Sequence, residues 1–327
     1  MSKVLTNNTG LSLAMAVWLA HDDYDNGASE VPEQELVSAT TLLKPTRQFV
    51  LSQRVPPQEE GTTDVTDLIA SSFGTAVHDS VENAWKHYPK AMKKLGYPQK
   101  VIDSVMINPT DGELAAHPNP LPVYLEQRYF RTIDGVTISG KFDQIIDGAL
   151  NDTKTTSVFG YMNGFNEEKY RLQLSIYRWL NPDKVTSDIA YIQLVFTDWQ
   201  RMMVKQNPKY PKHRVLEFKV NLLSLAETEA WIMGKLTEIR NNVMLDQDQM
   251  IRCNDEDLWR SAPKWKYYAN PEKMGRATKN FDDPASANAH KASAGKGVVI
   301  HVPGKVKACG YCSAFPICKQ KDEYDHD

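Results

Sequence analysis

The chain contains the stretch Ile138-Ser-Gly-Lys-Phe-Asp143-Gln-Ile-Ile-Asp-Gly-Ala-Leu-Asn-Asp152-Thr-Lys154-Thr-Thr156, which predicts a β-hairpin. Residues that favour β-strands alternate on both sides of Asp147-Gly148, the dipeptide that favours a two-residue type I′ turn. With that turn at the centre of the hairpin, Asp143 lies opposite Asp152 and Lys141 lies opposite Lys154. The sequence therefore predicts two carboxylates and two amines on facing strands.

The two opposed carboxylates indicate a bound divalent cation. Cross-strand neighbours lie about 5 Å apart at Cβ, where like charges repel, and a cation is the simplest reason to keep them together. Lys154 comes two residues after Asp152, so it projects from the same face of the strand. Metal-assisted phosphodiester hydrolysis requires this set, because acids hold the ion, the ion activates water, and the lysine positions that water or offsets charge. The alternative is a solvent-facing hairpin whose charges only keep the protein soluble.

Length and composition describe a globular protein with one large domain or one domain and an appendage. The 327 residues are 41% hydrophobic and 24% charged, with a net charge of -3. The longest apolar runs, such as residues 189–196, are too short to span a bilayer, and the N-terminus lacks the layout of a secretion signal. We therefore expect a cytoplasmic protein, in the host cytoplasm if a phage encodes it, with no membrane partner.

The order of the predicted elements indicates an α/β fold. Helical spacing is present over residues 67–88, 167–180 and 222–245, and strands are predicted within residues 121–131 and 136–156, at 189–196 and near 215–220. This order favours a sheet covered by helices. Residues 90–120 are rich in proline and are predicted to be irregular. We expect an N-terminal segment over residues 1–60, a core over 61–250 and a C-terminal extension over 251–327.

Four further polar residues are candidates for the same site. Glu126 is predicted within a strand that could lie beside the hairpin, and His78 follows Gly74-Thr75, a candidate helix start, and could add a nitrogen ligand. Gln173 and Tyr177 share one face of the helix predicted over residues 167–180 and could grip a phosphate or a bound water. Each of these residue types is also common as an ordinary structural residue.

Together, these residues resemble the RecB-like branch of the PD-(D/E)xK nuclease superfamily. The resemblance covers about residues 38–180 and runs through Ser38-Ala-Thr40, Gly74-Thr-Ala-Val-His78 with Glu82, Glu126, Gly140-Lys-Phe-Asp143, Asp152-Thr-Lys154-Thr155 and Gln173-Leu-Ser-Ile-Tyr177.

The resemblance implies a central mixed β-sheet flanked by helices and a site for Mg²⁺ or Mn²⁺. It implies that His78, Asp143 and Asp152 bind the metal and that Lys154 assists catalysis. It further implies that Glu126 and the helix with Gln173 and Tyr177 contribute to the catalytic site. The similarity is strongest to phage-encoded and CRISPR-associated members, which act on DNA ends.

The four cysteines indicate a second metal centre. Cys309-Gly-Tyr-Cys312-Ser-Ala-Phe-Pro-Ile-Cys318 places three thiols on a short loop, and Cys253 could supply the fourth ligand. The spacing resembles the C-terminal part of the four-cysteine [4Fe–4S] staple of some RecB-like nucleases. Those proteins take their first cysteine from before the nuclease motifs, whereas no cysteine precedes Cys253 here. Zinc is therefore the alternative, and reduced thiols without a metal are a third reading.

Two basic segments could contact nucleic acid, one over residues 201–214 and one, with interleaved aromatic residues, over residues 264–279. We predict a Mg²⁺- or Mn²⁺-dependent exodeoxyribonuclease that acts on linear DNA, single-stranded or duplex, in DNA processing or recombination. A recombination or replication protein could be a partner. The alternatives are a DNA-binding recombination accessory protein with a vestigial nuclease centre, and a nuclease for closed circular DNA or RNA.

Overall fold

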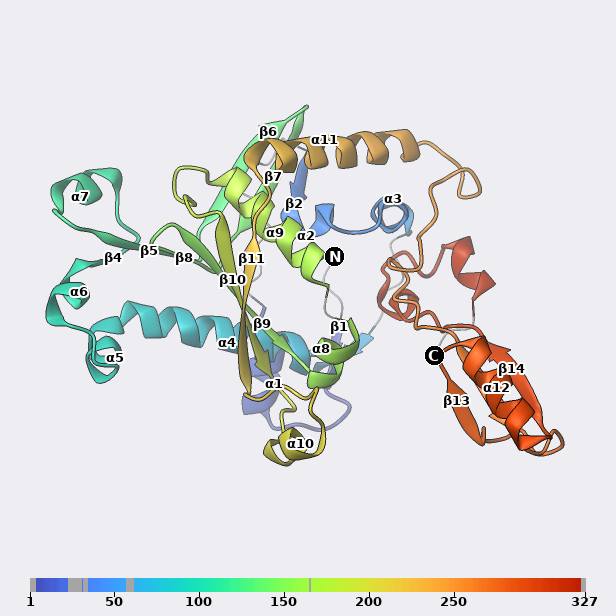
Figure 1. Cartoon of the computed structure of the whole chain (residues 1–327). Helices are drawn as coiled ribbons and strands as arrows, with labels where there is room; N and C mark the ends of the chain where they lie inside the picture. Colours follow the sequence, from blue (N-terminus) through green and yellow to red (C-terminus); the bar gives the residue numbers. More distant parts are fainter. Residues whose placement is uncertain (1–3, 23–30, 32–34, 57–61, 165, 325–327) are drawn as a thin grey trace. The chain divides into compact units, whose positions relative to one another are not determined.

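The computed structural model describes residues 4–22, 31, 35–56, 62–164 and 166–324 (Figure 1). The chain divides into two compact units. The first comprises Met1–Leu43 and Pro57–Leu236, and the second comprises Lys44–Pro56 and Thr237–Asp327. A short segment from the N-terminal part of the sequence thus belongs with the C-terminal part.

A six-stranded mixed sheet forms the centre of the first unit, with the strand order β11-β10-β9-β8-β5-β4. The pairs β4–β5 and β9–β10 are parallel, and the other neighbours are antiparallel. The strands are β4 (Val105–Ile107), β5 (Leu121–Leu125), β8 (Gln144–Ile146), β9 (Ala149–Thr156), β10 (Ile189–Phe196) and β11 (Val215–Asn221). The mixed α/β fold predicted from the sequence is therefore confirmed.

The hairpin between β8 and β9 has the predicted turn and register. Asp147 and Gly148 have φ values of 48° and 76°, and positive φ at both central residues is what a type I′ turn requires. Gln144 pairs with Asn151, which is the register that centres the hairpin on the turn. Asp143 lies just outside this ladder, one residue before β8.

A second sheet, of three strands, adjoins the hairpin along the chain. It has the order β2-β7-β6, with β2 (Leu36–Ser38), β6 (Arg128–Ile133) and β7 (Val136–Lys141). Lys141 pairs with Arg128 in this sheet, so the prediction that it lies opposite Lys154 was wrong. Glu126 lies in the connection between β5 and β6, so its predicted place within a strand was also wrong. Alternating β-formers predict strands, but they do not reveal that the chain changes sheets.

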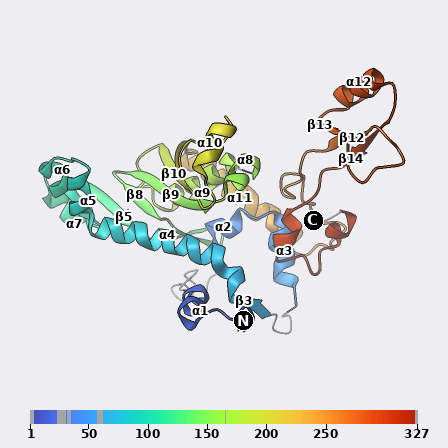
Figure 2. The same ribbon diagram turned by 90° about the horizontal axis from the view of Figure 1, so that it is seen from below.

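The helix α4 (Ile69–Lys86) lies beside strands β8 and β9 in both ribbon views (Figures 1 and 2). Near its C-terminal end, Trp85 and Tyr88 pack against a buried cluster formed by Val105, Val123 and Leu125. Burying an aliphatic side chain of this size contributes roughly 1.5–3 kcal/mol, so the cluster anchors the helix to the sheet.

The helix α9 (Glu167–Leu180) begins at Asn166, whose side chain accepts a hydrogen bond from the Lys169 N–H. It contacts β7 and buries Leu174, Ile176 and Trp179. The sequence predicted both bounds of this helix, because its apolar spacing is regular and its N-cap is strong.

Residues 90–120 are more regular than predicted. The segment contains β4 and three short helices, the last of which has a capping box between Thr110 and Glu113. The remaining elements of the first unit are β1 (Val4–Thr6), α1 (Leu13–Ala20), α2 (Ala39–Leu42), β3 (Thr62–Asp64), η1 (Val65–Leu68), α5 (Tyr88–Lys94), α6 (Gln99–Ser104), α7 (Asp111–Ala116), α8 (Val158–Gly164), α10 (Arg201–Gln206) and α11 (Leu225–Asn242), whose last residues belong to the second unit.

The second unit contains a three-stranded antiparallel sheet with β12 at its centre. Its core includes Tyr267, whose ring meets the His290 ring edge-on with centroids 4.9 Å apart. Its elements are α3 (Thr46–Arg54), β12 (Lys264–Tyr268), β13 (Lys279–Phe281), α12 (Pro284–Ala294), β14 (Val298–Val302), η2 (Ala308–Tyr311) and η3 (Lys319–Glu323). None of the helices in the described ranges combines the length and apolar character that a membrane span needs.

Candidate active site

Two acidic residues lie where the chain crosses between the two sheets of the first unit. Glu126 follows β5 and Asp143 precedes β8, and the Glu126 N–H donates a hydrogen bond to the Asp143 carbonyl oxygen at 2.9 Å. Glu126 has a φ of 49°, in the left-handed region that side chains with a Cβ rarely adopt. Such a conformation costs on the order of 1–3 kcal/mol and persists only where the surroundings impose it. The crossover therefore holds the two acidic residues beside each other.

His78, from α4, completes a group of three side chains that could bind a metal. Its Nδ1 lies 3.3 Å from Asp143 Oδ2 and 3.8 Å from Glu126 Oε1. One ligand atom from each residue lies within 4.8 Å of the other two. The side chains of His78, Glu126 and Asp143 are 28%, 20% and 13% exposed, so a substrate can reach them.

Asp152 and Lys154 form an ion pair on β9. Lys154 Nζ donates a hydrogen bond to Asp152 Oδ1 at 2.9 Å and lies 2.8 Å from Oδ2. The Asp152 side chain is only 3% exposed. Between the two residues, the Thr153 N–H donates to Asp143 Oδ2 at 2.8 Å, which ties the crossover to β9. The structure thus brings the predicted acids and lysine together, as the hairpin register led us to expect.

Gln173 and Tyr177 lie on the buried side of α9 and bind each other. The Gln173 Nε2–H donates to Tyr177 Oη at 2.9 Å, and burial raises the pKa of Tyr177 to about 12. A Cβ built on Gly140 would lie 2.9 Å from the Tyr177 ring, so the absence of a side chain at Gly140 lets the ring approach β7. Tyr177 lies close enough to Lys154 for each charge to affect the other residue's pKa.

The pKa values indicate excess negative charge at the site. Burial, and then the charge of Asp152, raises the pKa of Asp143 to about 7. The interaction with Glu126 is the largest cause of the raised pKa of His78. Burial alone would lower the pKa of Lys154, but Asp152 and Asp143 raise it further, so Lys154 remains an ammonium. These shifts follow from burial and from the close approach of the acidic and basic side chains.

The residues present fit a divalent metal. The donor set is one imidazole nitrogen with several carboxylate oxygens, a combination that divalent cations bind in proteins. Asp152 Oδ2 is buried, and the Lys154 ammonium lies 2.8 Å from it. A buried carboxylate oxygen needs a compensating charge, which Lys154 supplies, so the fit to a metal rests on His78, Glu126 and Asp143.

Sequence reasoning missed the partner of Glu126. Lys141 Nζ lies 2.8 Å from Glu126 Oε2, and the two residues come from different sides of the crossover. Burial alone would raise the pKa of Glu126, but the hydrogen bonds from His78 and Lys141 outweigh burial and lower it. Tyr170, one turn before Gln173 on α9, also has a pKa raised by burial. The position of Tyr170 on the helix face was a usable signal, whereas no local pattern connects Lys141 with Glu126.

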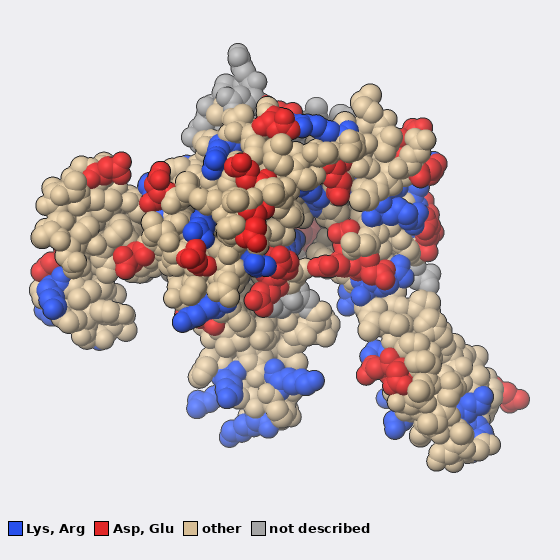
Figure 3. All heavy atoms as spheres, turned by 45° about the horizontal axis from the view of Figure 1, so that its top comes forward, with Lys and Arg blue, Asp and Glu red and all other residues tan. Residues whose placement is uncertain are grey.

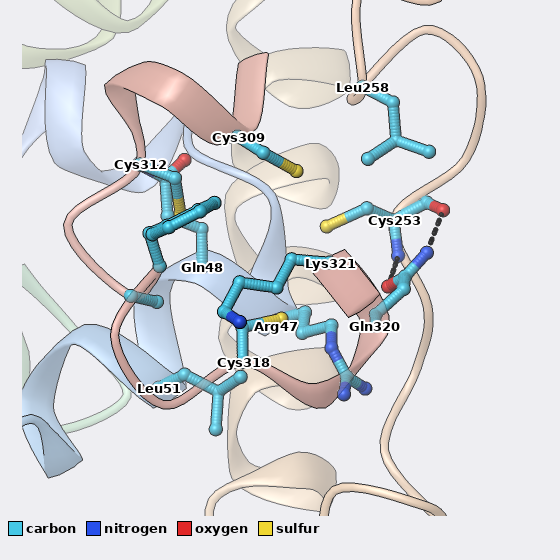
Figure 4. A pocket seen from close by; sticks show the side chains of 12 residues that line it. Arg47, Gln48, Leu51, Cys253, Leu258, Cys309, Cys312, Cys318, Gln320 and Lys321 are labelled. Atoms are coloured by element: carbon cyan, nitrogen blue, oxygen red, sulfur yellow. Dashed lines mark hydrogen bonds between the residues drawn. The ribbon is translucent and has the colours of Figure 1, made fainter. Parts of the chain in front are cut away.

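The four cysteines line one cavity in the second unit (Figure 4). All are free thiols, and the sulfurs of Cys253 and Cys309 point toward one another. Burial raises the pKa of Cys253 to about 12, and it also raises the pKa values of Cys309 and Cys312. Among the described residues, no three of the sulfurs, Cys318 included, lie within 4.8 Å of one another.

Two buried or half-buried glutamines hold the backbone around these cysteines. The Gln320 amide accepts from the Cys253 N–H at 3.0 Å and donates to the Cys253 carbonyl oxygen at 2.9 Å (Figure 4). The Gln247 amide donates to the Ile317 carbonyl oxygen at 2.8 Å and accepts from the Lys319 N–H at 2.9 Å, on either side of Cys318. The cysteine loop is therefore fixed by side-chain amides.

No protein-family model matches the chain, and no curated protein matches it. Among solved structures, it is similar to the protein SSO0001, with 14% identity over 72% of this chain and 86% of that chain and a TM-score of 0.37. It is also similar to an alkaline exonuclease from Laribacter hongkongensis, with 11% identity over 64% of this chain and 91% of that chain and a TM-score of 0.34. A phage-related exonuclease from Haemophilus somnus 129PT matches with 15% identity over 65% of this chain and 95% of that chain, with a TM-score of 0.28. TM-scores this low do not support a function by themselves.

Proposed function

We propose that the protein is a divalent-metal-dependent nuclease that hydrolyses phosphodiester bonds in DNA. One observation carries the proposal, namely the convergence of His78, Glu126 and Asp143 beside the ion pair of Asp152 and Lys154. Three acids around a histidine repel one another unless protons or a cation offset their charge. A half-buried lysine that keeps its charge suits a phosphate substrate, because it can donate to an anionic oxygen.

The roles of the residues follow from their contacts. His78, Asp143 and Asp152 would hold the cation, with Glu126 beside them. The bound cation would polarise a phosphate oxygen and lower the pKa of a water molecule. Lys154 acts as a donor and not as a base, because its raised pKa keeps it protonated near neutral pH. It orients the attacking water or stabilises the charge that develops on the phosphate. Gln173 and Tyr177 are positioning residues that pack beside Lys154.

Cleavage assays on four DNA forms test the proposal, using linear and circular, single- and double-stranded DNA with Mn²⁺, Mg²⁺ or EDTA. We expect metal-dependent cleavage and a loss of about 100-fold or more in Lys154→Ala and Asp152→Asn. Lys100→Ala, which changes an exposed lysine of α6, is the matched control and should cleave normally. Full activity in Lys154→Ala, or DNA binding without any cleavage by the unchanged protein, would refute the proposal.

The motifs resemble those of phage-encoded and CRISPR-associated nucleases that act on DNA ends, and on that resemblance we propose an exonuclease. Cleavage of linear DNA with closed circles left intact is the expected result. Nicking or linearisation of closed circles would instead show an endonuclease.

We also propose that the four cysteines hold an iron–sulfur cluster. The Cys309, Cys312 and Cys318 spacing, which resembles part of the [4Fe–4S] staple of some RecB-like nucleases, supports this assignment. Iron and sulfide analysis of protein purified without oxygen tests this, together with absorbance near 400 nm. Stoichiometric zinc in a colourless protein would contradict it.

A further inference from the structure

The connection between β10 and β11 carries a run of basic residues with no acidic residue among them. Between Trp199 and Leu216 the chain has five lysines and arginines and no Asp or Glu. Space-filling spheres show Lys and Arg gathered on a projection of the surface where Figure 1 places α10 (Figure 3). The basic side chains are Arg201, Lys205, Lys209, Lys212 and Arg214, and all are exposed.

In the described ranges, four of these five charges are not used inside the protein, whereas the Arg214 guanidinium donates to the Trp199 carbonyl oxygen at 3.5 Å. Within the described part of the chain, Arg201, Lys205, Lys209 and Lys212 have no carboxylate partner. A concentrated positive surface on a chain of net charge -3 is unfavourable by itself, so its most direct use is to bind an anionic partner. A row of phosphates has the complementary charge.

The aromatic residues of the segment stabilise its own fold. The Trp199 Nε1–H donates to the Pro211 carbonyl oxygen at 2.9 Å, and the Gln200 N–H donates to Tyr210 Oη at 2.9 Å. Stacking on unpaired bases needs free aromatic faces, whereas contact with a phosphate backbone needs exposed amines and guanidinium groups. The segment offers exposed amines and guanidinium groups and not free aromatic faces, which favours duplex DNA over a single strand.

The segment begins near the candidate active site. Lys154 on β9 lies level with Leu194 on the parallel strand β10, and the Thr197 N–H donates to the Thr156 carbonyl oxygen at 2.9 Å. At about 3.3 Å per residue, the five residues from Leu194 to Trp199 span at most roughly 16 Å, so the segment begins within that distance of the level of Lys154. That length corresponds to about five base pairs of duplex at about 3.4 Å each.

We propose that residues 199–214 bind the phosphate backbone of duplex DNA, beginning within about five base pairs of the bond that is cut. The distance between the segment and the scissile bond rests on the proposed nuclease function, whereas the binding of duplex DNA by the segment does not. The proposed contact is to phosphates, which carry no information on base sequence.

A matched pair of triple variants tests the binding of duplex DNA by the segment. The first combines Lys205→Gln, Lys209→Gln and Lys212→Gln, and the control combines Lys90→Gln, Lys93→Gln and Lys94→Gln, which remove the same charge from exposed lysines of the first unit. Fluorescence anisotropy with a labelled 30-base-pair duplex in EDTA, over a series of NaCl concentrations, measures affinity and its salt dependence.

We expect the first variant to bind about 10- to 100-fold more weakly and to lose about 2–3 from the slope of log K against log salt, because each lost phosphate contact removes about 0.9. The control should change the slope by less than about 1. An unchanged slope in the first variant, an equal loss in the control, or a loss seen only with single-stranded DNA would overturn the proposal.

Hydrolysis of bis(p-nitrophenyl) phosphate with Mn²⁺ separates this inference from the nuclease proposal. This small diester reaches the active site without touching the segment, so the first variant should hydrolyse it at the unchanged rate while it cleaves duplex DNA more slowly. A protein that hydrolyses neither substrate, yet binds duplex through these lysines, would refute the nuclease proposal and leave the binding proposal intact. A variant that loses diester hydrolysis as strongly as DNA cleavage would overturn the assigned role in binding.

Discussion

Gly140→Ala tests the packing of α9 on β7, because the space for a side chain is already filled. An added Cβ would lie 2.6 Å from Leu180 Cδ1 and 2.9 Å from the ring atoms Cδ1 and Cε1 of Tyr177. Carbon atoms pack favourably at about 3.5–4.0 Å, so these side chains must withdraw by roughly 1 Å. Overpacking of this kind costs about 1–3 kcal/mol. We therefore expect Tm to fall by about 4–8 °C for a loss of about 2 kcal/mol.

The same displacement should slow the reaction. Tyr177 lies beside Lys154, and a shift of about 1 Å in a positioned group can cost about 100-fold in rate. Thermal unfolding and DNA cleavage under saturating Mn²⁺ measure the two effects on one preparation. Gly234→Ala is the matched control, since its Cβ meets no atom within 4 Å in the interior of α11. That variant should be more stable by about 1 kcal/mol and keep its activity.

A double-mutant cycle with Leu180→Ala identifies the clash. Removing the Leu180 side chain from an unchanged protein costs about 2–5 kcal/mol, because it leaves a cavity. In combination with Gly140→Ala, the total loss should be smaller than the sum by about 0.5 kcal/mol or more, since the cavity admits the new methyl group. Wild-type Tm and activity in Gly140→Ala, or strict additivity in the cycle, would refute the packing described for α9 and β7.

Three further predictions concern charge and ligand positioning. Burial and a neighbouring carboxylate raise the pKa of Asp143 to about 7, so a proton must leave before the anion can bind a metal. Mn²⁺ affinity measured by calorimetry should therefore rise between about pH 6 and pH 8, with proton release. A pH-independent affinity would contradict this. Lys141→Met removes the cation that helps lower the pKa of Glu126, so the acidic limb of the pH–rate profile should move to higher pH. The free energy of unfolding should change by less than about 1 kcal/mol. An unchanged pH–rate profile would argue against the pairing of Lys141 with Glu126. Gln320→Ala leaves the N–H and carbonyl of Cys253 without their partner, so the iron or zinc content per chain should fall. An unchanged metal content would show that the Gln320 amide is not needed for metal binding.

The sequence predicted the features that depend on interactions between residues close together in the chain. The dipeptide Asp147-Gly148 tolerates positive φ at both positions, so it fixes the turn and hence the register that brings Asp143 toward β9. The apolar spacing of α9 and the continuous apolar character of β10 likewise gave their bounds, because each element's pattern is complete within its own residues. The spacing of Asp152 and Lys154 placed them on one face for the same reason, and their ion pair confirms it.

Tertiary structure decided what depends on contacts between distant segments. The chain crosses between two sheets at Glu126 and Asp143, and this crossover gives Glu126 its left-handed backbone and its partner Lys141. Similarly, the placement of α3 in the same unit as the cysteines has no signal in either stretch of sequence. A strand pattern reports which face of a residue is buried, but not which strand will lie beside it. That choice depends on the packing free energy of the whole sheet, which no window of sequence contains.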